Sequence, residues 1–400
     1  MFDLIKSEQG KVTNRKIIIK LLSHHGAITK PRLQELTGFT VATLNRTVNS
    51  LEQSGLVVVT DVAASSGGRK PLLYGLNPVS GYTIGINISR VYTKVALMDV
   101  TGNVLEADTF SMHEKSTPQA IMQNLLHAIH GFWSNIDKKK IMGCGVGLVG
   151  PIDKEHGIML NPANFPVKGW DNFKVKEYLH KLLGCPVIVE NGASAAALGE
   201  YRSFYNHLYR NIAFINCGIG VRLGTVVDGA ITTHLNGGEG DFGHTCTSIE
   251  GQLCNCGNYG CLEAYMSTRL LTEKFIDLIK QGRLSRALQI VNYDINALNF
   301  GIFCNAVEED DPLATDLVKT AAQHFAIAMS NLINISRPEL IVLSGQLINN
   351  CNLFYELSTK LALERVQRYS PIQVQFNKGR LQDNAVLVGM SHIVVDQLLE

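Results

Sequence analysis

The sequence contains no apolar run long enough to cross a membrane, and its first residues lack the apolar stretch of a secretory signal. Its nine cysteines are odd in number and mostly scattered, which fits a reducing compartment better than a framework of paired disulfides. The net charge of +1 gives no reason to expect a chain that is basic throughout. These absences predict a cytoplasmic protein without a membrane partner, and 400 residues are enough for two or three domains.

Positive charge is nevertheless concentrated at one end of the chain. Residues 1–78 contain ten Lys and Arg but only five Asp and Glu, so this segment carries a net charge of +5. The remainder of the chain therefore carries −4. A basic head on an acidic body is typical of a protein whose head binds a polyanion.

The head has the pattern of a helix-turn-helix. Apolar residues at helical spacing predict a first helix that ends near His25, and Thr29 is placed to cap a short second helix. Gly38 provides a turn, and Thr40 caps a third helix that ends at Gly55. The buried face expected on this third helix consists of Val41, Leu44, Val48 and Leu51. This order of helices and turns is that of a DNA-reading module.

Two β-prone runs, 56–60 and 71–76, follow the third helix and are joined by a glycine-rich segment. They predict a wing, a hairpin whose tip presents basic side chains to the DNA backbone or minor groove. Hydroxyl and basic side chains off the apolar face of the third helix would meet phosphates or bases. The candidate DNA-contacting residues are Thr40, Thr43, Arg46, Thr47, Gly67, Gly68, Arg69 and Lys70. The alternative is a protein-docking module with a solvated loop, and the basic wing tip argues against it.

From residue 81 onward strands and helices alternate, which predicts an α/β body. Apolar strands are expected at residues 82–89, 93–100, 141–149, 186–189, 212–215 and 340–343. Helices are expected over 119–133 and 314–335, and the second of these has a long apolar face. The opening strand-turn-strand segment and residues 212–229 look like similar units in two lobes.

One glycine-punctuated loop, residues 241–263, gathers cysteines and a histidine. Three thiolates and one imidazole are a ligand set of closed tetrahedral structural zinc sites. The predicted Zn²⁺ ligands are His244, Cys254, Cys256 and Cys261. A disulfide or unpaired thiols are the alternatives, but Cys254 and Cys256 are too close in sequence for easy disulfide geometry. Cys246 lies in the same loop and could replace one ligand.

Several motifs resemble those of the ROK family of repressors, open-reading-frame proteins and kinases: CNCGNYGCLE after GDFGH, VENGASAAALGE, GLVGPID, NFPVKGW, CGIGVRLG and RPELIVLSG. The resemblance extends over essentially the whole chain. With an N-terminal winged helix, the chain is similar to the regulator branch, which includes xylose, glucose and N-acetylglucosamine repressors. The resemblance implies a two-lobed actin/hexokinase-like fold, with sugar in the cleft and, in kinases, ATP beside it.

Two departures from the family pattern argue against phosphoryl transfer. In family kinases the segment matching VENGASAAALGE supplies an Asp that acts as catalytic base, but Gly192 occupies that position here. Family kinases also have an Asp followed by a glycine-rich phosphate loop, whereas this chain has Asn87 and then the bulky residues 88–92. The glycines within 218–224 are kept, and we interpret that segment as a structural hairpin. We therefore expect no catalytic residues and no kinase activity.

By motif match, the residues expected at sugar hydroxyls are Asn164, Asn191, Asp241, His244 and Glu263. Carboxylates and amides suit this task because they make directed hydrogen bonds to neighbouring hydroxyls. The family usually has Glu where this chain has Asp241, and His244 could bind metal and sugar through its two nitrogens. Without the family pattern, Asn191 or Glu263 would more often be a helix cap or surface residue. Trp170 could stack on a sugar or pack in the core.

Together these patterns predict a sugar-responsive DNA-binding regulator, a repressor of carbohydrate-utilisation genes, although an activator would use the same parts. We expect a winged helix over 1–80, a first lobe over 81–195 with 386–400, and a second lobe over 196–385 that holds the zinc loop and oligomer contacts. A homodimer or homotetramer would bind a palindromic operator, and a sugar or sugar phosphate would shift the lobes. The alternatives are a sugar kinase with a DNA-binding head and a regulator controlled by a partner protein.

Overall fold

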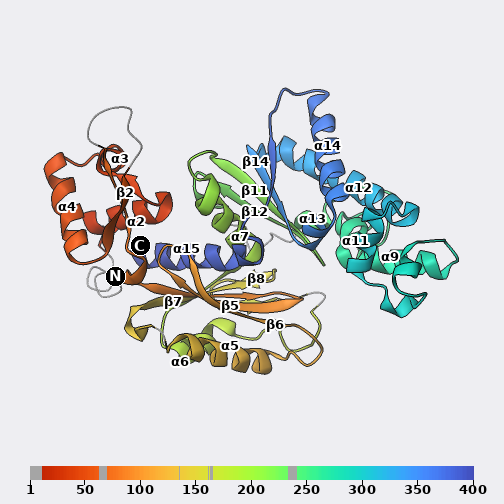
Figure 1. Cartoon of the computed structure of the whole chain (residues 1–400), viewed down its shortest axis with the longest axis horizontal. Helices are drawn as coiled ribbons and strands as arrows, with labels where there is room; N and C mark the ends of the chain where they lie inside the picture. Colours follow the sequence, from red (N-terminus) through yellow and green to blue (C-terminus); the bar gives the residue numbers. More distant parts are fainter. Residues whose placement is uncertain (1–10, 63–69, 135, 161, 163–164, 233–240) are drawn as a thin grey trace.

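The computed structural model describes residues 11–62, 70–134, 136–160, 162, 165–232 and 241–400. An N-terminal head stands beside a body that contains two five-stranded sheets with helices packed on them (Figure 1). The predicted α/β class of the body is thereby confirmed. Within the described ranges, no helix is both long enough and apolar enough to span a membrane.

In the described residues, the head has three helices and a small antiparallel sheet of order β1-β3-β2. Its elements are α2 (Asn14–His25), β1 (Ile28–Thr29), α3 (Lys30–Thr37), α4 (Val41–Gln53), β2 (Val57–Val62) and β3 (Leu72–Leu76). The predicted caps are present, because the hydroxyls of Thr29 and Thr40 accept backbone N–H groups at the starts of α3 and α4. This succession of elements is the one expected of a winged helix.

The buried face of α4 differs from the prediction in its first turn. Val41 is 58% exposed, so the apolar residues of this face are Leu44, Val48 and Leu51. Thr47 was expected on the outer face but is 7% exposed, and its hydroxyl donates to the carbonyl of Thr43. The reason is geometric: a residue three positions after Leu44 points to the same side of the helix.

The first body sheet has the strand order β10-β7-β4-β5-β6, with β4, β7 and β10 parallel to one another. Its strands are β4 (Tyr82–Ile88), β5 (Tyr92–Asp99), β6 (Val104–Ser111), β7 (Ile141–Leu148) and β10 (Val187–Asn191). A two-stranded sheet, β8 (Ile152–Asp153) with β9 (Ile158–Met159), follows β7. α5 (Pro118–Phe132) and α6 (Val175–Leu183) lie below this sheet in the view of Figure 1 and pack into the same core.

The second sheet has the order β13-β12-β11-β14-β15, with β11, β14 and β15 parallel. Its strands are β11 (Asn211–Cys217), β12 (Val221–Val227), β13 (Ala230–Ile231), β14 (Leu340–Ser344) and β15 (Gln375–Lys378). β11 and β12 pair directly across the glycine turn, so this segment forms a hairpin. The two lobe boundaries predicted from the sequence remain a proposal.

Helices of the second half share one apolar core with this sheet. They are α8 (Glu263–Met266), α9 (Thr268–Lys280), α10 (Ala287–Ile290), α11 (Phe300–Glu308), α12 (Pro312–Ser336), α13 (Gln346–Asn350) and α14 (Asn352–Gln367). α12 and α14 pack along each other, and Phe325 stacks on Phe354 with ring centroids 5.5 Å apart. This is the largest apolar core in the described part of the chain.

Two helices run through the middle of the molecule. α7 (Gly192–Glu200) continues into the π-helical turn η3 (Tyr201–Tyr205), and α15 (Ala385–Leu399) packs against α7. A Cβ atom at Gly389 would lie 1.7 Å from the carbonyl oxygen of Ala195, so this close crossing requires glycine. α15 extends from the body to the head (Figure 1).

Candidate functional site

A cavity of about 480 Å³ opens where parallel strands of both sheets end. The last residues of β7, β10 and β14, and residues near the ends of β4 and β11, line it: Leu148, Asn191, Ser344, Asn87 and Asn216. Ligands of open α/β sheets bind outside the carboxyl ends of the strands. The cavity is therefore the candidate ligand site.

Asn191 lies at the wall of the cavity and caps α7. Its side-chain oxygen accepts the backbone N–H of Ala193 at 2.9 Å. The residue is 2% exposed, and its Nδ2 has no hydrogen-bond partner in the described part of the chain. An unsatisfied buried donor costs about 1–3 kcal/mol, so this amide is well placed to donate to a ligand.

Gly192, the first residue of α7, also lines the cavity. A Cβ atom built there would have the carbonyl oxygen of Leu148 as its nearest neighbour, at 3.6 Å, which is an ordinary contact. The backbone of Gly192 is not among those with positive φ. Neither sterics nor backbone conformation therefore requires glycine at position 192. Because glycine has no side chain, no carboxylate projects into the cavity from this position.

Two arginines that the sequence analysis did not single out line the cavity, Arg90 after β4 and Arg222 in β12. Arg222 Nη1 donates to Glu263 Oε2 at 3.0 Å, and both side chains are largely buried. Burial, and then the charge of Arg222, lowers the pKa of Arg90 to about 10, while Glu263 opposes the shift. The Arg90 guanidinium is therefore positively charged at neutral pH. The sequence signal that could have identified them is their position: Arg222 lies in the glycine turn, and Arg90 lies in the segment 88–92 that replaces the phosphate loop.

The residues expected to bind sugar are only partly brought together. Asn191 lines the cavity, whereas Asp241, His244 and Glu263 are not among its lining residues. Glu263 is instead held by Arg222 and by the backbone N–H of Val221, at 2.9 Å. Asn164 lies outside the described residues.

Trp170 is a core residue. It is 1% exposed, and its indole N–H donates to the carbonyl of Ser116 at 3.1 Å. The ring packs between aromatic neighbours in the core of the first sheet, with Phe165 at 5.7 Å and Phe173 at 6.1 Å between ring centroids. Trp170 therefore packs in the core, the second of the two roles considered for it.

The four predicted metal ligands lie close together. The ligand atoms of His244, Cys254, Cys256 and Cys261 are all within 4.8 Å of one another. The Sγ atoms of Cys256 and Cys261 are 3.7 Å apart, and Cys254 Sγ is 3.7 Å from His244 Nδ1. Metal–sulfur bonds of about 2.3 Å at tetrahedral angles place two sulfurs roughly 3.8 Å apart. The group could hold a metal ion, and the exposed Cys246 is not part of it.

The candidate DNA-contacting residues fall into three groups. Thr40, Arg46 and Lys70 are exposed, and Thr43 is half-buried. Thr47 is buried, so the prediction that it faces DNA is wrong. The proposed wing-tip residues Gly67, Gly68 and Arg69 lie outside the described residues. Val41 and Ala42, which were not among the predicted DNA-contacting residues, are exposed in the first turn of α4.

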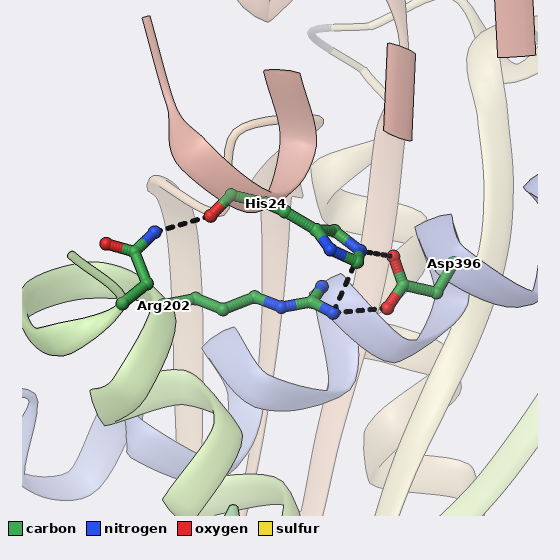
Figure 2. Close-up of polar contacts among 4 residues, drawn as sticks. His24, Arg202 and Asp396 are labelled. Carbon is green, nitrogen blue, oxygen red and sulfur yellow. Dashed lines mark hydrogen bonds and ion pairs between the residues drawn. The ribbon is translucent and has the colours of Figure 1, made fainter. Parts of the chain in front are cut away.

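The head contacts the body through a polar group at the end of α2, shown in Figure 2. His24 Nε2 lies 2.9 Å from Asp396 Oδ1 of α15, and Arg202 Nη2 of η3 forms an ion pair with Asp396 Oδ2. Because a carboxylate can only accept, the ring nitrogen of His24 donates to Asp396. Three segments that are far apart in sequence thus meet at one carboxylate.

Further contacts join η3 and the residues after it to the head. The side-chain amide of Asn206 donates to the carbonyl of His24. His207 Nε2 lies 3.2 Å from the carbonyl of His25, and the two rings stack with centroids 5.6 Å apart. The continuous stretch α7–η3 therefore begins at the cavity and ends against the head.

Residues 83–397 match the ROK family. The chain belongs to the ROK family. It is 27% identical over 395 residues, 97% of each chain, to a xylose repressor from Caldicellulosiruptor bescii. Its structure is similar to that of a ROK family transcriptional regulator described as a homologue of the E. coli MLC protein, with a TM-score of 0.76, 25% identity and 96% of each chain covered.

The ROK body also has the fold of a kinase. A ROK family glucokinase from Streptomyces griseus, in complex with glucose and AMPPNP, matches with a TM-score of 0.67 and 23% identity. The match covers 78% of this chain and 99% of the kinase. The regulator therefore matches nearly the whole chain, head and body together. The kinase matches a share of this chain that is about as long as the body alone.

Proposed function

We propose that this ROK chain is a cytoplasmic, sugar-responsive transcriptional repressor of carbohydrate-utilisation genes and does not phosphorylate sugars. The observation that carries the proposal is the path from cavity to head. α7 begins with Gly192 at the cavity, and η3 contacts the head through Arg202, whose Nη2 lies 3.1 Å from His24 Nε2. An effector that moves α7 would therefore change how the head is held.

The head would bind a palindromic operator as part of a homodimer or homotetramer, because two symmetry-related heads match two half-sites. Arg46 and the first turn of α4 would enter the major groove, since they are exposed on the head. Lys70, with Arg69, would contact the backbone or the minor groove from the wing. An effector that alters the freedom of the two heads would weaken their joint grip on DNA.

We further propose that the His and Cys group holds a structural Zn²⁺. The donor set supports zinc, because three sulfurs and one ring nitrogen leave no open position for a substrate in a tetrahedral site. His244 and Cys261 belong to the segment that also carries Glu263, the partner of the cavity residue Arg222. The metal would thus brace one wall of the effector site.

A sugar kinase with a DNA-binding head is the competing function, supported by the shared fold. Phosphoryl transfer to a sugar needs a base for the attacking hydroxyl, and Gly192 provides no carboxylate at the matching position. Control by a partner protein is the other alternative, in which the cavity would bind no sugar. Measurements of ADP production and of DNA release by sugars distinguish these two alternatives from the proposed function.

The test is a selection of duplex DNA from a random-sequence pool with the full-length protein, followed by fluorescence anisotropy on the selected fragment. We expect a sequence with two-fold symmetry, and release when a member of a panel of pentoses, hexoses, hexosamines and their phosphates is added. Coupled ADP production above background with any panel sugar would favour the kinase. Selected DNA that no panel compound releases would favour a partner protein.

A further inference from the structure

Residues 200–209, which include the end of α7 and the whole of η3, lie between the head and one edge of the second sheet. On the head side they contact the end of α2, and Figure 2 shows Arg202 directed towards His24. On the other side they contact the edge strand β15 and the loop after it. The residues that contact the head are Arg202, Asn206 and His207, and those that contact β15 or its loop are Glu200, Phe204, Tyr205 and Tyr209. One short segment thus joins the head to the sheet edge.

Glu200 makes a fully buried contact with the loop. The residue is 0% exposed, and its Oε1 accepts the backbone N–H of Leu381 at 2.8 Å. Burial raises the pKa of this carboxyl, whereas hydrogen bonds from the backbone of Leu381 and Arg380 oppose the shift. The other oxygen, Oε2, has no hydrogen-bond partner in the described part of the chain. Because a buried carboxyl that loses its donors is unfavourable, the loop and Glu200 should move together.

The same strand and loop also hold the aromatic side chains of η3. The Arg380 guanidinium lies over the Phe204 ring, 4.1 Å from its centroid. The side-chain amide of Asn377 in β15 donates to the hydroxyl of Tyr205 at 3.4 Å, and Tyr205 is 3% exposed. The position of η3 therefore depends on where β15 and its loop lie.

The loop leads directly to the cavity. Gln382, Asp383 and Ala385, which follow it, line the cavity. A Cβ atom at Gly199 would lie 2.5 Å from the carbonyl oxygen of Ala385, so the start of α15 rests on the end of α7 with no side chain between them. A shift of this cavity wall would consequently reach Glu200 and η3 through direct contacts.

The π-helical turn is an element that can have two arrangements. The backbone N–H of Asn206 donates to the carbonyl of Tyr201, five residues earlier, at 2.9 Å. Such single π-helical turns are rare and occur frequently at functional sites. A return to α-helical bonding would rotate the residues after the turn by one position, about 100° around the helix axis. The contacts to α2 depend on this register.

We propose that Glu200 couples the cavity to the head, by holding η3 in its π-helical register while the loop 379–381 stays in place. The inference rests on the proposed function and deepens it, because it names the contact through which an effector acts. An effector that moves residues 382–386 pulls the loop away from Glu200. η3 then changes register, and Arg202 no longer holds the end of α2.

The experiment is hydrogen exchange of the full-length protein, measured by mass spectrometry without effector or DNA. Glu200→Leu removes the acceptor, and exchange of the α2 amides should become about ten-fold faster, although Glu200 is not among the residues that contact α2. Glu200→Gln keeps an oxygen acceptor of the same reach and should leave α2 unchanged. The amides of α5, in the core of the first sheet, should be unchanged in both variants.

A second variant keeps the test decisive if Glu200→Leu does not fold. Arg380 is exposed, so Arg380→Ala should fold, and it should accelerate α2 exchange in the same direction but less. Arg283→Ala, another exposed arginine, is the matched control. Because coupling is reciprocal, Arg202→Met should in turn accelerate exchange of the Leu381 amide.

Unchanged α2 exchange in Arg380→Ala and in folded Glu200→Leu would overturn the coupling. Equal acceleration in α5 would also overturn it, since it would reveal only a loss of stability. Where a sugar of the panel releases the selected DNA, that release should shrink from about ten-fold in affinity to less than about two-fold in Glu200→Leu. A protein that selects no DNA would refute the proposed repressor but leave the coupling to be decided by exchange alone.

Discussion

His24 Nε2 on the head lies 2.9 Å from Asp396 Oδ1 on the last helix of the chain. Burial raises the pKa of Asp396, but the hydrogen bond from His24 and the charge of Arg202 outweigh it and hold this pKa well below its usual range. The carboxylate is therefore ionised at neutral pH. It is the point at which the head, α15 and the end of the α7–η3 stretch are joined.

Asp396→Asn should loosen the head from the body. The Arg202 side chain is 4% exposed, and a buried charge that loses its partner costs about 3 kcal/mol. We expect faster hydrogen exchange of the α2 amides, together with DNA binding that no longer responds to effector. Asp316→Asn, on the exposed surface of α12, is the matched control. Unchanged α2 exchange and a normal effector response in Asp396→Asn would remove this contact from the mechanism.

Stability should decrease as the pH falls below about 6.5, because of His392. Burial, and then the charge of Arg202, lowers the pKa of this ring to about 3 from 6.5. Below 6.5 the unfolded chain binds a proton that the folded chain does not, so the free energy of unfolding falls by up to about 1.4 kcal/mol per pH unit. Urea unfolding at pH 7, 6, 5 and 4 measures the slope. His392→Asn should flatten it, whereas the exposed His127→Asn should not.

Cys256→Ser should abolish binding of the proposed zinc ion and impair effector binding. Metal content by mass spectrometry should fall from about one zinc per chain to a small fraction, with a lower melting temperature, because three ligands remain. Cys246→Ser is the matched control, since Cys246 lies in the same loop but outside the group. Normal effector affinity in a zinc-free Cys256→Ser protein would show that the metal does not brace the site.

Gly192→Asp should fold and still lack kinase activity. The site has space for a side chain, and Asp at the first position of α7 gains about 0.3–1 kcal/mol from the helix dipole. Since residues 88–92 still differ from a phosphate loop, a base alone should not create turnover. Coupled ADP release with the sugar panel measures it. Sugar-dependent turnover would mean that Gly192 alone accounts for the proposed lack of kinase activity.

Arg46→Ala should weaken binding to the selected DNA by about ten-fold and reduce its dependence on salt, because one phosphate or base contact is lost. Arg46 is exposed on α4, whereas Arg283, in the second half of the chain, provides an exposed control for the loss of one charge. Anisotropy titrations between 50 and 200 mM salt provide the comparison. Equal slopes for Arg46→Ala and the unmodified protein would exclude α4 as the reading helix.

Local patterns were sufficient for several features of this protein. Thr29 and Thr40 were identified as caps because a cap is decided by neighbours within three residues. His244 and the three cysteines span only 18 positions, so a glycine-rich loop can bring them together without help from the rest of the chain. The α/β class followed from alternating apolar strands and amphipathic helices, and the ROK motifs identified the family.

Tertiary structure decided what spacing could not. His24 and Asp396 are 372 positions apart, and Arg222 meets Glu263 across 41 positions, so no periodicity in the sequence connects them. The exposure of Val41 depends on where the head core ends along α4, which a helical repeat does not specify. Charge at the cavity was decided in the same way. Arg90 follows β4 of the first sheet and Arg222 lies in β12 of the second, and only the packing of the two sheets brings both residues to one cavity.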